Sequence, residues 1–275
     1  MMRCSLFDLF RFLPVFLSSA VSLSSVAKLS AEEFDAGIAL VTTADGIVEL
    51  SEPNDTAEAL KLHRVLELSG RKISTGKSST CGLVLSNGAA LLLGPNTSAR
   101  FSTFSQRPFD SAEQSREYEP SISKIAFVIE SGSVALEASH LSPLSEILIT
   151  FPYGSVRTSS AHGAVIYNGE DLRIIAQEGN FVFNYPKGNA REFIAAGQII
   201  EFSPQSAIRA EPEVRKSIET ITPQTRRRIA AARYASKRVI FQVKGEGRGI
   251  PEAKLVASEN WMEQPSPRPY VYKND

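Results

Sequence analysis

Short apolar runs alternate with glycine-containing turns along much of the chain, most clearly between Ile147 and Phe202. The runs are 147–151, 164–167, 172–176, 181–185 and 199–202. They are rich in β-branched and aromatic residues, which favour extended backbone, and the glycines between them tolerate positive φ. Strands separated by such turns are typical of a tightly wound all-β domain, and the pattern leaves no place for a helix in this stretch.

Two turn signals divide the earlier part of the chain. Asn87-Gly88 stands between two apolar runs and predicts a β-hairpin, which ends at Gly94-Pro95-Asn96. Ala44-Asp45-Gly46 stands between the two apolar runs of residues 34–50 and predicts another hairpin. The apolar residues within 59–68 favour a period of two, so this segment is predicted to be a further strand.

A long polar segment, the 101–123 insert, interrupts the strand pattern. Irregular segments of this length are uncommon in compact domains unless they serve a purpose or cover other residues. Phe104 and Phe109 lie within the insert and are expected to pack back over the β core. Strand pattern resumes at 124–129 and 134–137.

The C-terminal part of the chain has a different character. Thr222 is a favourable N-cap and Pro223 a favourable first helical residue, and the alanine- and arginine-rich segment 224–242 has no glycine or proline. A helix is therefore predicted over 224–242. Glycines and prolines are frequent after Gly245, so that part is expected to be unstructured.

Composition places the chain among ordinary globular proteins. Hydrophobic residues make up 43% and charged residues 22%, which allows a real core and argues against wholesale disorder. Lys plus Arg and Asp plus Glu both number 30, which excludes a globally basic nucleic-acid binder. The charges are unevenly spread, because residues 32–205 carry 13 basic and 21 acidic residues, whereas residues 206–275 carry 14 and 8.

The first residues have the features of a secretory signal peptide. Arg3 and Arg11 precede an uncharged apolar stretch, residues 12–26, and small residues end at Ala31 before an acidic pair. A membrane anchor is the alternative, but the stretch is shorter than the roughly 20 residues needed to span a bilayer. We expect cleavage after Ala31, no transmembrane segment in the mature chain, and a periplasmic or extracellular location.

The cysteine content is consistent with an exported protein that has no internal disulfide. Cys4 lies in the predicted signal peptide, which leaves Cys81 as the mature thiol. Cys81 alternates with apolar residues and is interpreted as a small buried hydrophobic residue. An intermolecular disulfide and a catalytic thiol are the alternatives.

The chain contains no pattern that specifies catalysis, a metal or a cofactor. It has no G-x-S-x-G, and His63, His140 and His162 each stand apart without metal-ligand spacing. His140 and His162 adjoin turn-like stretches, which leaves a site at the loop rim as an alternative to ordinary loop histidines. The segment from Gly70 to Gly76 ends like a phosphate loop, but its glycines are one residue too far apart and a strand follows.

Basic residues cluster in the predicted C-terminal helix. They could bind a polyanion or an anionic membrane surface, or the helix could dock loosely on the acidic body. The second interpretation is favoured, because the charges surround the helix instead of forming one stripe. The residues that could bind a polyanion are Arg226, Arg227, Arg228, Arg233, Lys237 and Arg238.

A set of short motifs follows in order over residues 37–202. The motifs are Thr75-Gly76, Ser78-Ser79, Leu85-Ser86-Asn87-Gly88-Ala89, Leu93-Gly94-Pro95-Asn96-Thr97, Glu130-Ser131-Gly132-Ser133-Val134, Phe151-Pro152-Tyr153-Gly154, Gln177-Glu178-Gly179-Asn180-Phe181-Val182 and Ala195-Ala196-Gly197-Gln198. No single motif is specific, but their order and spacing resemble the FecR domain, a β-rich module of exported bacterial proteins. The insert, with Phe104-Ser105-Gln106-Arg107-Pro108-Phe109 and Glu119-Pro120-Ser121-Ile122-Ser123, resembles that of stand-alone secreted members, including verrucomicrobial ones.

The resemblance implies a solenoid-like stack of short sheets. Strand spacing alone would also allow a distorted β-sandwich. The chain departs from the family at Gly163-Ala164-Val165-Ile166, where a threonine usually follows the glycine. The predicted domains are a signal peptide (1–31), a FecR-like β domain (32–205), a basic helical segment (206–245) and an unstructured tail (246–275).

These features predict a non-enzymatic exported module that binds or signals, without a cofactor, metal or nucleic acid. Its partner is expected to be another envelope protein or a cell-surface polymer. Recognition is expected on loops, chiefly the 101–123 insert, with Phe104, Arg107, Phe109 and Tyr118 as candidate contacts. The alternative is a structural envelope protein whose basic tail binds cell-wall or outer-membrane polyanions, and a hydrolase on the histidine-bearing loops is a third possibility.

Overall fold

The computed structural model describes six stretches of the chain. These are residues 34–52, 56–109, 119–186, 190–209, 214–243 and 251–255. The predicted signal peptide and most of the predicted tail lie outside the described residues. Strands dominate the described part, so the prediction of an all-β fold is confirmed.

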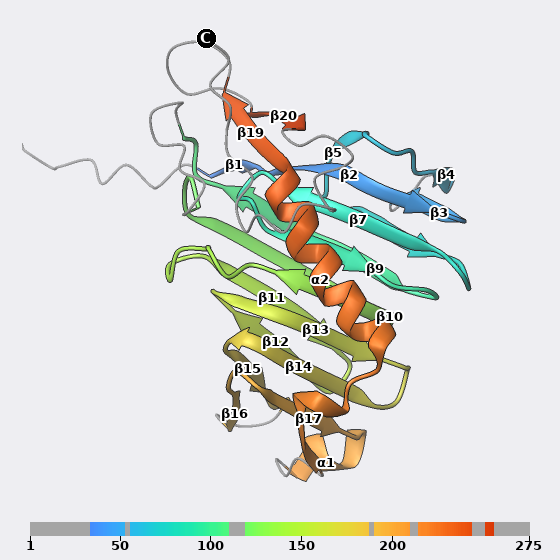
Figure 1. The fold of residues 1–275 in the computed structure, drawn as a ribbon, viewed down its shortest axis with the longest axis vertical. Helices are drawn as coiled ribbons and strands as arrows, with labels where there is room; N and C mark the ends of the chain where they lie inside the picture. The colour runs from blue at the N-terminus through green and yellow to red at the C-terminus, as the bar shows by residue number, and fades with distance from the viewer. Residues whose placement is uncertain are drawn as a thin grey trace, which may run out of the picture. The chain divides into compact units, whose positions relative to one another are not determined.

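The strands β1–β18 form two sheets that share the long strand β10 (Figure 1). Strands β10 and β11 pair in parallel, and every other pairing of the described strands is antiparallel. Sheet A has the order β4 (Glu58–Ala59), β3 (Val48–Ser51), β6 (Lys72–Thr75), β9 (Ser98–Gln106), β10 (Ser123–Glu137), β11 (Glu146–Phe151), β12 (Gly154–Thr158), β15 (Phe181–Asn184) and β16 (Arg191–Ile194), with β1 (Asp35–Ala36) on the far end of β9. Sheet B has the order β5 (Val65–Glu67), β2 (Ile38–Asp45), β7 (Thr80–Leu85), β8 (Ala90–Leu93), β10, β13 (Ala161–Tyr167), β14 (Leu172–Gly179), β17 (Gln198–Phe202) and β18 (Val214–Ser217).

The chain advances through both sheets almost in sequence order. After β10, two strands enter sheet A, two enter sheet B, and this alternation is repeated up to β18. Such winding produces a stack of short paired strands, as the solenoid-like prediction required. Because the two sheets also enclose one core, the arrangement shares the layering of a sandwich.

Strand β10 belongs to both sheets because it changes direction at Gly132. Its first half pairs with β9 and β11 in sheet A, and its second half pairs with β8 and β13 in sheet B. Gly132 has φ +96°, and a Cβ there would lie 2.3 Å from Cα of Thr97. Only glycine fits this crossing without displacing backbone. The two strands predicted at 124–129 and 134–137 are therefore one strand with a bulge.

Inward-facing aromatic side chains fill the space between the sheets. Phe101 and Phe127 lie in sheet A with ring centroids 5.1 Å apart. Phe183 of sheet A stacks on Phe202 of sheet B, with centroids 4.1 Å apart. All four are at most 1% exposed. These contacts join the layers, as the alternation of apolar residues in the strands predicts.

The two predicted hairpins have different outcomes. Strands β7 and β8 flank Asn87-Gly88 and pair with each other, which confirms that hairpin. Strands β2 and β3 flank Gly46 but lie in different sheets, so the second hairpin prediction was wrong. The turn at Gly46 instead carries the chain from sheet B to sheet A. The strand predicted over 59–68 is likewise two short strands, β4 and β5.

The irregular insert is shorter than predicted. Strand β9 continues to Gln106 and pairs with β10 there, so residues 101–106 belong to a strand and the segment between β9 and β10 is 107–122. Phe104 belongs to β9, where a bulge exposes both Ser102 and Thr103 and so interrupts the alternation of buried and exposed residues. Phe104 and Phe109 are 1% and 2% exposed, which confirms that they pack on the core.

The C-terminal helix forms nearly as predicted. Short helices α1 (Pro204–Arg209) and η2 (Ile218–Thr220) precede helix α2 (Pro223–Arg238), and Thr222 caps α2 by accepting a hydrogen bond from the Thr225 amide. The helix ends at Arg238, because the β-branched residues that follow form strand β19 (Val239–Val243). Strand β19 pairs with β20 (Pro251–Leu255), so the prediction of an unstructured tail was wrong for 251–255.

Candidate functional site

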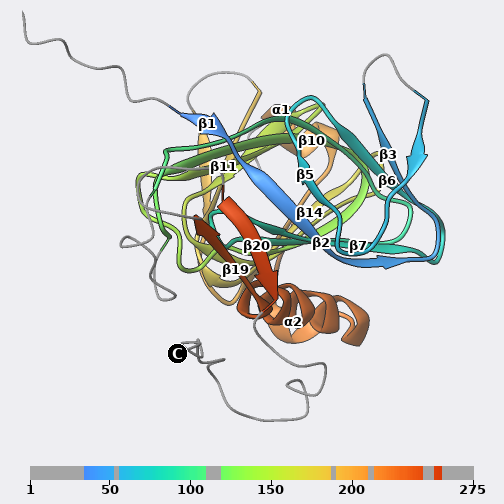
Figure 2. The ribbon, with the colours of Figure 1, turned by 90° about the horizontal axis from the view of Figure 1, so that it is seen from above.

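Helix α2 lies on the outer face of sheet B (Figure 2). Ile229 and Ala232 of α2 are at most 1% exposed and pack on an apolar row that crosses five strands of the sheet. Val239 and Phe241 of β19 extend this contact over a second apolar cluster. The row consists of Leu92, Ala135, Ala164, Ile175 and Ile199, each paired with the next across the sheet.

Three ionisable residues form a second row on the same face of sheet B. Glu137 stands two residues beyond Ala135 on β10, and the strand register pairs it with His162 on β13. His162 is paired in turn with Glu178 on β14. Glu137 and His162 stand two residues from Ala135 and Ala164 of the apolar row, and side chains two residues apart on a strand point to the same side. A bulge in β14 places Glu178, three residues after Ile175, opposite His162, so this row also faces α2.

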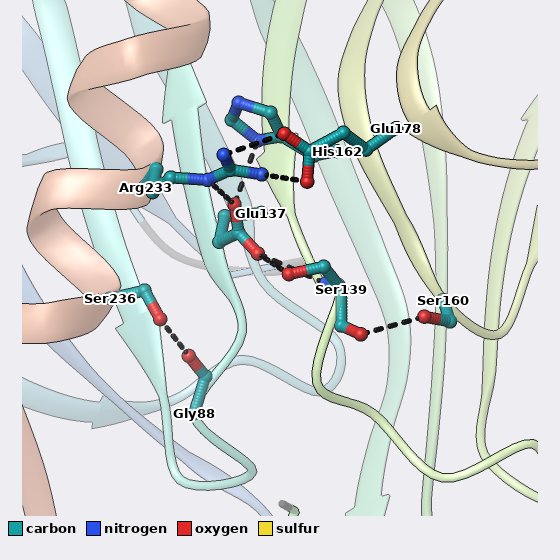
Figure 3. A network of polar contacts seen from close by, with 8 residues as sticks. All are labelled: Gly88, Glu137, Ser139, Ser160, His162, Glu178, Arg233 and Ser236. Carbon is teal, nitrogen blue, oxygen red and sulfur yellow. Dashed lines mark hydrogen bonds and ion pairs between the residues drawn. The ribbon is translucent and has the colours of Figure 1, made fainter. Parts of the chain in front are cut away.

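Arg233 of α2 joins the two carboxylates of this row (Figure 3). Its Nε donates to Oε2 of Glu137 at 2.8 Å. Its Nη1 and Nη2 donate to Oε1 and Oε2 of Glu178 at 2.7 and 2.6 Å, which is the bidentate geometry that favours arginine over lysine. The guanidinium thereby links α2 to β10 and β14 at once. We call Glu137, His162, Glu178 and Arg233 the α2 latch.

Glu137 is the buried centre of the α2 latch. Its side chain is 4% exposed, and its Oε1 accepts hydrogen bonds from the amide and the hydroxyl of Ser139. Burial raises the pKa of Glu137, but the neighbouring His162, Ser139 and Arg233 outweigh burial and hold the pKa well below its usual range. Hydrogen bonds from Arg233 likewise lower the pKa of Glu178. Both carboxylates are therefore charged at neutral pH.

His162, the histidine of the α2 latch, is 1% exposed. Its Nδ1 is 2.8 Å from Oε2 of Glu137, at ion-pair distance but off the direction of a hydrogen bond, and no other partner of Nδ1 occurs in the described stretches. The imidazole thus faces a carboxylate with a donor position that is not fully used.

The other histidines do not join this cluster. His140 follows β10, close to the β7–β8 turn, and burial lowers its pKa. His63 is exposed in the loop before β5 and has φ +62°. Within the described residues, no group of three His, Cys, Asp or Glu side chains could hold a metal ion.

The candidate contacts of the insert are placed in different environments. Phe104 and Phe109 are buried, Arg107 is exposed, and Tyr118 lies outside the described residues. Of the described candidates, Arg107 is therefore the one whose side chain reaches solvent.

The base of the insert is held by hydrogen bonds at both ends. The Arg107 amide donates to the Ile122 carbonyl at 2.8 Å, and the Ser121 hydroxyl donates to the Arg107 carbonyl. Oε2 of Glu119 accepts hydrogen bonds from the Ser142 amide, at 2.9 Å, and the Ser145 hydroxyl. Burial raises the pKa of Glu119, which these hydrogen bonds oppose. The insert thus leaves the body from a fixed base.

The basic candidates divide into internal and exposed residues. Arg233 is committed to the latch, and Arg228 donates to the Ser133 hydroxyl at 3.3 Å. Lys237 and Arg238 are partly buried, whereas Arg226 and Arg227 are exposed. Docking of α2 on the body is confirmed, but the buried apolar residues and the latch make it closer than the loose contact that was predicted.

Cys81 and the Gly70–Gly76 segment have structural roles. Cys81 is fully buried on β7, and burial raises its pKa to about 12, so the thiolate is not available at neutral pH. The Gly70–Gly76 segment forms β6, and the next regular element is the strand β7. No helix N-terminus follows there to receive a phosphate, in agreement with the sequence interpretation.

The α2 latch was not predicted from the sequence. The sequence left His162 open as part of a loop-rim site and gave Arg233 as a polyanion-binding candidate, whereas neither Glu137 nor Glu178 was predicted to be a site residue. Glu137 occupies a buried position two residues after Ala135, whereas Glu178 is half exposed, and no local pattern distinguishes either of them from a surface glutamate. Their meeting depends on strand register and on a helix far along the chain.

Comparisons with known proteins are sparse. No family model matches the chain, and no curated protein matches it. Two crystal structures of a protein from Parabacteroides distasonis ATCC 8503, described as an anti-sigma factor, align with 11% and 13% identity and TM-scores of 0.38 and 0.39. Each alignment covers 53% of this chain and 59% of the other, and similarity of this size carries no argument about family or function. In the described residues, no helix has the length and apolar character needed to cross a membrane.

Proposed function

We propose that this chain is a non-enzymatic exported module of the FecR kind, which binds a partner protein in the cell envelope through the insert at 107–122. The observation that carries the proposal is the clamped base of the insert, formed by the Arg107–Ile122 backbone bond and the contacts of Glu119. A loop held at both ends loses less conformational entropy on binding, which favours recognition.

The motifs that resemble the FecR domain support this division between scaffold and loop. Gly88, Gly132, Gly154, Gly179 and Gly197 all belong to those motifs and all have positive φ at turns or bulges. Such positions favour glycine for backbone reasons. The motifs therefore specify the scaffold, and the partner would be selected by the segment they do not include.

The proposal is tested with the whole mature chain, because removal of residues 206–275 would uncover the apolar row of sheet B. One variant replaces 110–118 with a glycine-serine segment of equal length and retains Phe109 and Glu119. The control variant is Arg226→Ser/Arg227→Ser, which changes exposed residues of α2. Solubilised envelope from the source cell is passed over each immobilised chain, and the captured proteins are cross-linked and identified.

We expect one discrete protein to be captured by the wild type and the control, to be lost with the loop variant, and to cross-link to the insert. Equal capture by all three chains would overturn the assignment of the insert. Loss with the control alone would favour the second candidate function.

The second candidate is binding of envelope polyanions by the basic helix. The exposure of Arg226 and Arg227 favours this candidate. Because Arg233 and Arg228 make contacts within the fold, the proposed binding site for polyanions is Arg226 and Arg227. Binding of anionic polysaccharide or anionic lipid vesicles would then weaken steeply with salt and fall in the Arg226→Ser/Arg227→Ser variant.

A further inference from the structure

The chain contains two Asn-Gly turns that lie in different surroundings. Gly88 and Gly169 have φ +89° and +101°, and in each turn Oδ1 of the asparagine accepts a hydrogen bond from the amide two residues further along, at 3.0 and 2.8 Å. These two features are enough to form the turn. Asn168 is exposed, whereas Asn87 is fully buried. The burial of Asn87 therefore needs an explanation beyond the turn.

The side-chain nitrogen of Asn87 makes a contact that the turn does not require. Its Nδ2 donates to Oγ of Ser123 at 2.9 Å, and this hydroxyl donates in turn to Oε1 of Glu119. Asn87 and Ser123 are both 0% exposed, so water cannot replace either partner. The β7–β8 turn is thereby connected to a carboxylate of the insert.

Glu119 lies near the C-terminal end of the insert and is held from two loops. Its Oε2 accepts hydrogen bonds from the Ser142 amide and the Ser145 hydroxyl, both in the loop between β10 and β11. Its own amide donates to the His140 carbonyl at 3.1 Å. Asn87 reaches the other carboxylate oxygen through its bonded hydroxyl. The position of Glu119 therefore depends on the β7–β8 turn as well as on the β10–β11 loop.

The β7–β8 turn is itself fixed from its other side. Oγ of Ser236, on α2, donates to the Gly88 carbonyl at 2.7 Å (Figure 3). The His140 imidazole forms a hydrogen bond with the backbone of Asn87, and it approaches the turn so closely that a Cβ on Gly88 would lie 2.6 Å from its Nε2. A turn that is held by a helix and by a neighbouring loop is a rigid support for the insert.

We propose that Asn87 is a positioning residue for the insert: its side-chain amide, acting through Ser123, fixes Glu119 and thereby the orientation in which the insert meets its partner. The asparagine has two separate tasks, since Oδ1 closes the turn and Nδ2 holds the insert. The statement about the partner rests on the proposed function, whereas the positioning itself can be measured without any partner.

Two variants separate these tasks. Asn87→Asp keeps an acceptor for the turn but has no side-chain N–H to donate. Ser123→Ala removes the connecting hydroxyl, leaves the turn intact and introduces no charge, so it carries the test if Asn87→Asp does not fold. The matched control is Asn168→Asp, which makes the same chemical change in the exposed Asn-Gly turn.

The first measurement is amide hydrogen exchange in the full chain. The amides of Arg107 and Glu119 report on the base of the insert, and the Leu85 amide, which donates to the Ala89 carbonyl at 2.8 Å, reports on the hairpin. We expect exchange at Arg107 and Glu119 to become about tenfold faster in Ser123→Ala, because a buried hydrogen bond is lost. Exchange at Leu85 should stay within about twofold of wild type, and the control should change none of the three amides.

Two results would overturn the positioning role. Unchanged exchange at Arg107 and Glu119 in both variants would show that the insert is held without Asn87. Equal acceleration at Leu85 would show that the network only stabilises the hairpin.

The second measurement uses the envelope protein captured by the wild-type chain as the probe. We expect the affinity of Ser123→Ala for it to fall about tenfold, because the insert must be ordered again on binding, while cross-links still form at the insert. Unchanged affinity together with faster exchange at Arg107 and Glu119 would overturn the link between positioning and binding. Capture by the chain with 110–118 replaced would refute the proposed function instead, and the exchange measurement would still decide the role of Asn87.

Discussion

Two glutamates on one strand show how differently the same residue type can act in this fold. Glu130 lies in the first half of β10, where its carboxylate meets Lys72 and Arg100 on the outer face of sheet A. Glu137 lies beyond the crossing, where its carboxylate meets Arg233 beneath α2. Their side chains are 38% and 4% exposed. Glu130 and Glu137 are only seven positions apart, and Gly132 lies between them.

Burial determines how much each ion pair contributes to stability. The partners of Glu130 come from neighbouring strands of the same sheet, and all are partly in water, so the gain is small and sensitive to salt. The partner of Glu137 comes from a helix 96 residues further along the chain and is needed to compensate a charge that water cannot reach. The Glu130 cluster lies on the surface of sheet A, whereas the Glu137 cluster joins helix α2 to sheet B.

The largest loss of stability is expected from a substitution at Gly132, where β10 passes from sheet A to sheet B. Gly132→Ala would place a Cβ 2.3 Å from Cα of Thr97 and force alanine to adopt φ +96°. We expect a loss of about 3 kcal/mol or more in the free energy of unfolding. Urea denaturation measures the loss. Gly169→Ala is the matched control, because it has φ +101° but no atom within 4 Å of the added Cβ. Equal losses in the two variants would show that backbone strain, not the crossing, sets the cost.

The second prediction concerns Glu137, the buried glutamate, and its partner Arg233. Arg233→Met keeps much of the side-chain bulk but leaves Glu137 without its charged partner from α2. We expect a loss of about 3 kcal/mol, together with faster amide exchange in α2, because breaking a buried pair leaves an uncompensated charge. Arg226→Met on the exposed side of the same helix should change stability by less than about 0.5 kcal/mol.

Adding Glu137→Leu to Arg233→Met sharpens this test. Removing both charges should recover part of the lost stability, since the remaining buried charge is then gone. A double variant that is less stable than the sum of the single losses would contradict the view that Glu137 is costly without its partner.

Much of the scaffold could be predicted from the sequence because it follows local rules. Apolar periodicity located most strands after Ile147, Asn87-Gly88 located a hairpin, and Thr222-Pro223 located the start of α2 within one residue. The errors arose where pairing is not local. Ala44-Asp45-Gly46 has the composition of a hairpin turn, but only the pairing of β2 with β7 and of β3 with β6 reveals a change of sheet.

The candidate site was less predictable for the same reason. Arg233 could be seen as part of a basic helix, but its two acidic partners lie on strands that are separated from it by 55 and 96 residues. Nothing in the local sequence of Glu137 distinguishes it from Glu130, since both stand in apolar alternating strands. Which of them is buried depends on the crossing at Gly132 and on the docking of α2.

The smallest loss of stability is expected at Glu130, the more exposed of the two glutamates. The hydrogen bond from Lys72 is the main cause that lowers the pKa of Glu130 to about 2, against a usual value of about 4.3 in an unfolded chain. The lowered pKa means that the pairing of Glu130 contributes stability above about pH 4.3 and loses it as pH falls toward 2. Because the side chain is partly exposed, the contribution should not exceed about 1 kcal/mol.

Glu130→Gln should therefore cost at most about 1 kcal/mol near pH 7, and the difference from wild type should shrink as pH falls toward 2 or when salt is raised to about 1 M. Urea denaturation of both proteins under the three conditions measures this. A loss as large as that of Arg233→Met, unaffected by salt, would mean that sheet A depends on its outer charges as strongly as α2 depends on its latch. The contrast between the two ends of β10 would then reflect strand pairing in general and not burial.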